Sequence, residues 1–222
     1  MSGPKSTSSR QRRAQLRAYK SLAESDDALA RLIARHGRPD PFSWGAWEEA
    51  VGDDAFAELV LHILGQQIST QAALTIYGRL RATLGGTVGP AEVIAVPEEA
   101  LRAAGLSGAK ARSLRDLAER VLDGRLDFER LARSDDVTAQ AELEAVRGIG
   151  PWSAQVFLLH HLRRGDIFPA ADIGLLRGAQ SAFALAARPT AVELARRAER
   201  WRPFRSYAAA LLWARSGDGT AR

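Results

Sequence analysis

The stretch IFPAADIGLLR carries one acidic residue, Asp172, just ahead of an apolar run with helical spacing. This position is at or near the residue that caps the helix. The positive end of a helix dipole favours an anion, so the carboxylate should stay ionised there. Such a group can stabilise a developing positive charge or orient a water molecule for attack. A plain helix cap, which contributes about 1 kcal/mol, is the alternative.

A glycine-rich turn precedes this acid. Gly148, Ile149 and Gly150 separate two amphipathic segments, and Pro151 takes the favoured first position of the second one. Glycine has no Cβ to keep a partner away, and the N–H groups at a helix start form an anion site. The turn could therefore hold a DNA phosphate without reading a base, with the Ile149 side chain between the helices. A simple connector between two helices is the alternative.

The elements that carry these residues are all expected to be helices. Apolar residues recur at spacings of three and four along the chain, whereas strand-like alternation is absent. Glycine, proline and aspartate mark the short connectors. The sequence therefore predicts an all-α protein with about ten helices.

The composition is that of a globular protein with a modest basic excess. Of the 222 residues, 46% are hydrophobic, and the net charge is +5. A basic balance favours a polyanionic partner, although arginine enrichment can also reflect genomic base composition. Cysteine is absent, which excludes disulfides, thiolate-held iron–sulfur clusters and cysteine zinc sites. We expect neither a metal site nor a cofactor.

The N-terminus is polar and basic and lacks the apolar centre of a signal peptide. We expect residues 1–13 to form a disordered basic tail. No apolar stretch reaches the roughly 18 residues of a membrane span, so we expect no membrane association. A cytoplasmic protein, associated with the nucleoid if the source is bacterial, is the resulting expectation.

The string LEAVRGIGPWSA resembles the helix-hairpin-helix motif. That motif has an apolar residue, a glycine-hydrophobic-glycine turn, and small residues one turn on, here Ser153 and Ala154. An aspartate after a Gly/Pro-rich loop is similar to the arrangement in helix-hairpin-helix DNA glycosylases. Asp172 matches that aspartate. Asp166 is the nearest rival, but we expect a solvated turn residue there.

Three further segments, LVLHILGQQISTQAA, LRAAGLSGAKARSL and WRPFRSYAAALLW, resemble the 3-methyladenine DNA glycosylase II (AlkA-type) family. The resemblance runs from about Phe42 to Trp213. It implies two helical subdomains with the active site in the cleft between them. We expect residues 14–55 with 166–222 to form one subdomain. Residues 56–165 would form the other and contain the hairpin at 136–163.

The resemblance also implies an activity. Members of this family remove alkylated bases such as 3-methyladenine and 7-methylguanine from duplex DNA, the first step of base excision repair. Relatives that also cut the backbone have a lysine where this chain has Trp152. The resemblance thus implies a monofunctional enzyme without lyase activity, with Asp172 as the catalytic residue. We expect a monomer that acts on double-stranded DNA with damaged bases.

The family pattern assigns roles to further residues. Trp152 and Trp213 would line the base pocket, where an aromatic face suits a cationic base. Gln67, backed by Gln66, would fill the gap left by the extruded base. Ordinary core packing is the alternative for the tryptophans, and a polar helix end for the glutamines. Val156 departs from the pattern and puts the lesion range in doubt.

The remaining DNA contacts would come from the hairpin, through Gly148, Ile149, Gly150, Ser153 and Ala154. Two other functions stay open. One is a glycosylase for another lesion, such as uracil or a deaminated or oxidised purine. The other is a non-catalytic helix-hairpin-helix DNA-binding protein, against which an acid at the DNA face argues. His62 is expected to be a satisfied core residue, and adjacent His160 and His161 diverge too far to chelate a metal.

Overall fold

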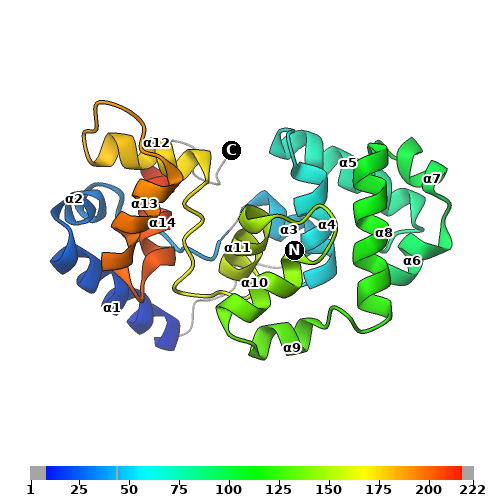
Figure 1. Ribbon diagram of the computed structural model, residues 1–222, viewed down its shortest axis with the longest axis horizontal. Helices are drawn as coiled ribbons and strands as arrows, with labels where there is room; N and C mark the ends of the chain where they lie inside the picture. The colour runs from blue at the N-terminus through cyan, green and yellow to red at the C-terminus, as the bar shows by residue number, and fades with distance from the viewer. Residues whose placement is uncertain (1–8, 44, 217–222) are drawn as a thin grey trace. The chain divides into compact units, whose positions relative to one another are not determined.

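The computed structural model describes residues 9–43 and 45–216, and within those ranges every regular element is a helix (Figure 1). The prediction of an all-α fold is confirmed. The described residues form fourteen α-helices rather than about ten, because several connectors contain helices of only six residues. The elements are α1 (Ser9–Ser25), α2 (Asp27–His36), α3 (Ala46–Val51), α4 (Ala55–Gly65), α5 (Thr70–Thr83), α6 (Pro90–Ala95), α7 (Glu98–Ala103), α8 (Gly108–Leu122), α9 (Phe128–Arg133), α10 (Asp136–Glu144), α11 (Pro151–His160), α12 (Ile173–Ala182), α13 (Ala191–Ala198), the 3₁₀ turn η1 (Glu199–Trp201) and α14 (Arg205–Ser216).

The basic N-terminal segment is shorter than expected. Helix α1 begins at Ser9, so residues 9–13 are helical and not part of a disordered tail. Glutamine, arginine and alanine are good helix formers, and they extend a helix that is anchored by the buried side chains of Tyr19 and Leu22. Residues 1–8 of the predicted tail lie outside the described residues.

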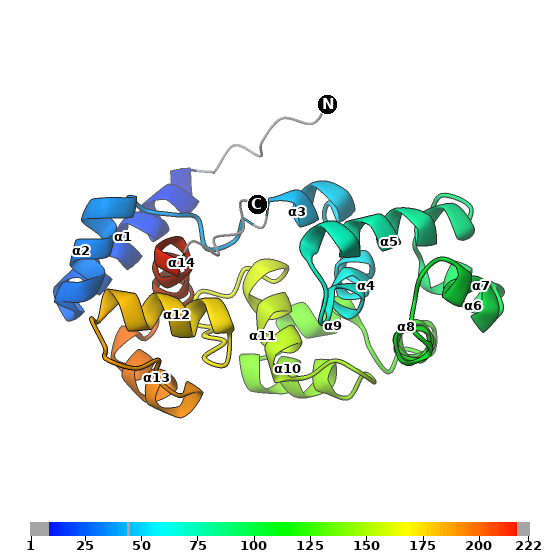
Figure 2. The same ribbon diagram turned by 90° about the horizontal axis from the view of Figure 1, so that it is seen from above.

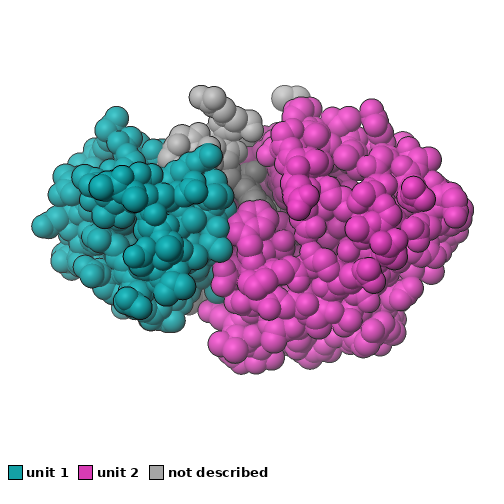
Figure 3. Space-filling view, turned by 45° about the horizontal axis from the view of Figure 1, so that its top comes forward, with its two compact units in different colours: residues 1–43, 164–222 teal, residues 44–163 magenta. Residues whose placement is uncertain are grey.

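The chain divides into two compact units, coloured separately in Figure 3. Unit 1 combines both chain ends, residues 1–43 and 164–222. Its core gathers buried side chains of α1, α2, α12 and α14 around Trp201. Helices α12 and α14 lie side by side (Figure 2), and a Cβ on Gly178 would collide with the carbonyl of Leu212. Glycine at that position therefore allows the two helices to pack closely.

Unit 2 comprises residues 44–163 and is built around α4. Every residue of α4 from Phe56 to Leu64 is buried, and α3, α5, α8 and α11 pack around it. A helix that is buried on all sides in this way is a core helix.

The boundaries between the units differ from those predicted. The first falls after Ser43 instead of residue 55, and the second after Arg163 instead of residue 165. The reason for the first is Trp47 of α3, whose ring lies 5.5 Å from His62 and would sit 2.6 Å from a Cβ on Gly65. At the second, the Arg164 carbonyl accepts a hydrogen bond of 2.6 Å from Ser206 in α14. These tertiary contacts leave no periodic signal in the sequence.

None of the helices that the structure describes combines the length and apolar character needed to cross a membrane.

Candidate active site

The carboxylate of Asp172 is fixed at the start of α12. Asp172 is the N-cap residue, as predicted, and its Oδ1 accepts a hydrogen bond of 2.9 Å from the backbone N–H of Leu175. The same oxygen accepts a second hydrogen bond, of 2.8 Å, from the indole N–H of Trp213. The side chain is half-buried. Two N–H donors on one oxygen set the orientation of the carboxylate.

Trp213 lies near the end of α14, the helix that packs against α12. A Cβ on Gly174 would lie 3.0 Å both from Asp172 Oδ1 and from Trp213 Cδ1. The absence of a side chain at Gly174 therefore leaves room for the indole beside the carboxylate. Sequence reasoning singled out Trp213 as a base-stacking residue but missed both its bond to Asp172 and the role of Gly174.

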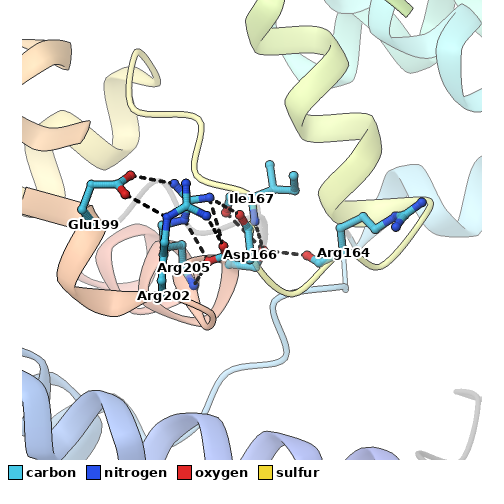
Figure 4. A network of polar contacts seen from close by, with 7 residues as sticks. Arg164, Asp166, Ile167, Glu199, Arg202 and Arg205 are labelled. Carbon is cyan, nitrogen blue, oxygen red and sulfur yellow. Dashed lines mark hydrogen bonds and ion pairs between the residues drawn. The ribbon is translucent and has the colours of Figure 1, made fainter. Parts of the chain in front are cut away.

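Asp166 is not the solvated turn residue that we expected. Its carboxylate accepts hydrogen bonds of 2.8 Å from Arg205 Nε and 2.7 Å from Arg202 Nη1 (Figure 4). Glu199 in turn pairs with both arginines. The cluster ties the segment that leads to Asp172 onto the start of α14, the helix of Trp213. Its charge is neutralised by two guanidinium groups, which leaves Asp172 as the stronger candidate for chemistry.

The hairpin turn between α10 and α11 lies in unit 2. Gly148 has φ +79°, a conformation that favours glycine, and a Cβ on it would lie 2.5 Å from Ser113 Oγ. Gly150 precedes α11 without a side-chain cap, and Pro151 is the first helical residue, as predicted. Gly148, Gly150 and Pro151 are exposed. The N-terminus of α11 is thus open at the surface of the unit.

The other hairpin residues face inward. Ile149 and Ser153 are each 4% exposed, and Ala154 is fully buried. Their side chains form the base of the turn, so any DNA contact from these three positions would have to come from the backbone.

The GQQIS segment follows the end of α4. Gln66 is the C-cap residue of α4, and its side-chain Nε2 donates a hydrogen bond of 2.6 Å to the Gly148 carbonyl. Gln67 has φ +62° and an exposed side chain. The structure thus brings the two glutamines and the hairpin turn together within unit 2.

Trp152 stands on α11 with 36% of its surface exposed, over a buried polar cluster. Its ring centroid lies 6.3 Å from that of His62, which is 1% exposed and thus buried as predicted. Glu58, which sequence reasoning missed, lies 2.8 Å from His161 Nδ1 and 3.8 Å from His62 Nε2. Burial raises the pKa of Glu58, but the hydrogen bond from His161 and the charges of His161 and nearby His62 outweigh burial and lower it to about 2. Trp152 therefore rests edge-to-face on a buried histidine that lies beside a buried carboxylate.

The described residues contain no group of three or more histidine, aspartate or glutamate side chains that could hold a metal ion.

The chain matches a known family over most of its length. The model of the HhH-GPD superfamily base excision DNA repair proteins covers residues 60–203. DNA-3-methyladenine glycosylase 1 of Schizosaccharomyces pombe is 30% identical over 166 residues, which are 72% of each chain. DNA-3-methyladenine glycosylase 2 of Escherichia coli is 30% identical over 174 residues, which are 74% of this chain and 58% of the relative.

Solved structures are similar over nearly the whole chain. A DNA-3-methyladenine glycosidase from Bacillus halodurans has a TM-score of 0.76 and 32% identity, and the match covers 90% of this chain and 89% of that one. A Schizosaccharomyces pombe 3-methyladenine DNA glycosylase in complex with abasic DNA has a TM-score of 0.77 and 27% identity, covering 89% and 95%. With its glycine hairpin and its helix-capping aspartate, the chain belongs to the HhH-GPD superfamily of base excision DNA repair proteins.

Proposed function

We propose that the protein is a monofunctional DNA glycosylase that removes alkylated bases, such as 3-methyladenine and 7-methylguanine, from duplex DNA. The observation that carries this proposal is the Asp172 carboxylate, held at the start of α12 by Leu175 and Trp213. The names of the relatives support the alkylated substrate. The protein acts as a monomer on double-stranded DNA with damaged bases and needs no cofactor.

The chemistry follows from the charge of Asp172. Breaking an N-glycosidic bond builds positive charge on the sugar, and a fixed anion stabilises that charge without reorganising. The same carboxylate can orient the water molecule that completes hydrolysis. Because both N–H donors bind Oδ1, the plane of the carboxylate is set before the substrate arrives.

Hydrolysis without a covalent amine intermediate is supported by the positions of the lysines. Trp152 stands where lyase relatives have a lysine. Lys110 Nζ donates to the carbonyls of Leu64 and Gln66, at 2.7 and 2.9 Å, so it is committed to the end of α4. A Schiff base would require that amine to leave both acceptors and lose its proton.

Base recognition is assigned to Trp152 and Trp213. A cationic alkylpurine stacked on an indole gains about 0.5–2 kcal/mol from the cation–π interaction. Gln67 fills the gap in the duplex, and the exposed N-terminus of α11 with Gly150 holds a backbone phosphate. Ile149, Ser153 and Ala154 support that turn from beneath.

The test is release of bases from methylated duplex DNA, with the freed bases identified by mass spectrometry. Free 3-methyladenine and 7-methylguanine are the expected products. Release of uracil or hypoxanthine alone, from DNA that contains all four lesions, would favour the alternative glycosylase. No release of any base from folded, DNA-binding protein would favour a non-catalytic DNA-binding protein.

A second test addresses the missing lyase step. Borohydride added during turnover is expected to trap no protein–DNA adduct, and strands are expected to break only after alkali or heat. A strong trapped adduct would contradict the assignment as a monofunctional enzyme.

A further inference from the structure

One face of α8 contacts both turns that we assign to DNA binding. Lys110, Ser113 and Asp116 follow at intervals of three residues, so they line neighbouring turns of one side of the helix. Each of the three reaches a different point of the GQQIS segment or of the hairpin. The sequence motifs assign α8 no role in DNA binding.

Lys110 secures the GQQIS segment. Its ammonium group donates to the carbonyls of Leu64 and Gln66, the last turn of α4, at 2.7 and 2.9 Å. A cation at the C-terminus of a helix satisfies open carbonyls and complements the negative end of the dipole. Partial burial lowers the pKa of Lys110. Gln66, whose carbonyl accepts from Lys110, directly precedes Gln67. The positive φ of Gln67 sets the direction of its exposed side chain.

Ser113 and Asp116 secure the hairpin. Ser113 occupies the space that a Cβ on Gly148 would need. Asp116 Oδ2 accepts a hydrogen bond of 2.7 Å from the backbone N–H of Arg147 and one of 2.9 Å from Arg120 Nε. The arginine balances the charge of the carboxylate, so the bond to the turn carries little electrostatic penalty.

A direct bond completes the arrangement. Gln66 Nε2 donates to the Gly148 carbonyl at 2.6 Å and so joins the two turns to each other. The backbone beside Gln67 and the backbone of the hairpin are therefore fixed both by this bond and through α8. Fixing them before binding reduces the ordering cost that binding would otherwise incur.

We propose that α8 is a positioning element and that Lys110 is a positioning residue, which holds the Gln67 segment and the hairpin turn as one preorganised DNA-binding surface. The proposal rests on the proposed DNA-binding roles of those two turns. It assigns Lys110 no contact with DNA.

The experiment compares Lys110→Met with Lys110→Arg, and uses Lys20→Met as the control for lost charge, since Lys20 is an exposed lysine of α1. The probe is a duplex with a tetrahydrofuran abasic analogue, and its Kd is measured over a series of salt concentrations. Lys110→Met should raise the Kd about tenfold, since two charge-assisted hydrogen bonds are lost. Lys110→Arg can still donate to both carbonyls and should stay within about threefold of wild type.

The salt series separates positioning from direct phosphate contact. A lysine that contacts a phosphate reduces the slope of log Kd against log salt by about 1 when it is removed. For Lys110→Met the slope should not change, and the single-turnover excision rate at saturating enzyme should stay near wild type. Wild-type affinity of Lys110→Met, a loss as large in Lys110→Arg, or a reduced slope would each overturn the proposal. Thermal unfolding of both variants checks that they fold.

Gln67→Ala distinguishes this proposal from the function on which it rests. If Gln67→Ala weakens binding and Lys110→Met does not, the gap-filling role stands and the positioning role is wrong. If Lys110→Met weakens binding with an unchanged slope and Gln67→Ala does not, Gln67 is not the gap filler and α8 acts through the hairpin.

Discussion

Two helices of ten residues each, α11 and α12, begin in opposite ways. Helix α12 begins after Asp172, whose carboxylate accepts a hydrogen bond from the first turn. Helix α11 begins after Gly150, which offers no side-chain cap and is exposed. Helices of equal length present similar positive ends, so the difference lies in which anion each one receives. The start of α12 holds an anion of the protein itself, and we assign the start of α11 to an anion of the ligand.

The residue at each of these two helix starts suits the anion that we assign to it. A carboxylate at Gly150 would occupy the site that we propose for a DNA phosphate. An uncharged residue at Asp172 would remove the anion that we propose for the developing cation. We therefore infer that the start of a helix serves catalysis in unit 1 and binding in unit 2.

The largest effect is expected from Asp172→Asn. The amide keeps the size of the side chain and an oxygen for the cap, but it carries no charge to stabilise the sugar cation. Excision of 3-methyladenine should fall about a thousandfold while duplex affinity stays within about twofold. Asp127→Asn is the matched control, because Asp127 caps α9 in the same way, and it should retain wild-type excision. The measurement is base release under single-turnover conditions.

Gly150→Glu tests the other helix start. The added charge should weaken binding to damaged and undamaged duplexes alike, by at least about tenfold at low salt. Gly150→Ala adds a Cβ in open space and no charge, so it should bind nearly as wild type. Gly78→Glu adds the same charge at an exposed position of α5 where a Cβ also meets nothing, and controls for net charge. Unchanged binding by Gly150→Glu in a filter or fluorescence assay would remove the hairpin as the phosphate anchor.

Trp213 donates its N–H group to Asp172, and we assign its ring to the base pocket, so the two contributions can be tested separately. Trp213→Leu loses the aromatic face, so excision of cationic 3-methyladenine should fall more than excision of neutral hypoxanthine, by about twofold to thirtyfold. Trp213→Phe keeps a ring but loses the hydrogen bond to Asp172, so it should slow both lesions by a similar factor, about tenfold. Single-turnover rates for the two lesions in the same duplex decide this. An equal loss for both lesions in Trp213→Leu would mean that the ring only fills space.

Glu58 is another fixed carboxylate, but its partners are histidines and not a helix start. Its folded-state pKa of about 2 lies below the ordinary value of 4.5, so its ionised form stabilises the fold above pH 4.5 and that contribution is lost as pH falls toward 2. Glu58→Gln should lower the free energy of unfolding by about 1–3 kcal/mol at pH 7 and by less at pH 3.5. Urea unfolding at the two pH values measures the difference. A deficit that does not shrink at pH 3.5 would show that the charge of Glu58 is not the stabilising feature.

Local signals in the sequence were sufficient to predict the helical fold, the helix cap at Asp172 and the hairpin turn. Each of these depends on residues within a few positions of one another. The bonds that complete the site could not be predicted in this way, because they join residues far apart in the chain. Trp213 is 41 residues from Asp172, Gln66 is 82 from Gly148, and Glu58 is 103 from His161.

The predicted start of unit 2 differs from the observed one for the same reason. Trp47 of α3 packs against His62 and Gly65, and these contacts place α3 in unit 2. Asp166 shows the limit of interpreting a residue from its neighbours. Its sequence context, RRGDIF, suggests a solvated turn, whereas Arg202 and Arg205 reach it from 36 and 39 residues away.

If one helix start serves chemistry and the other serves binding, a titration of enzyme in single-turnover excision separates the two roles. For each variant the measurement gives a maximal rate and the enzyme concentration that produces half of it. Asp172→Asn should lower the maximal rate about a thousandfold and leave the half-saturating concentration unchanged. Gly150→Glu should leave the maximal rate unchanged and raise the half-saturating concentration by at least about tenfold. A maximal rate of Asp172→Asn close to wild type would show that Asp172 is a helix cap and nothing more.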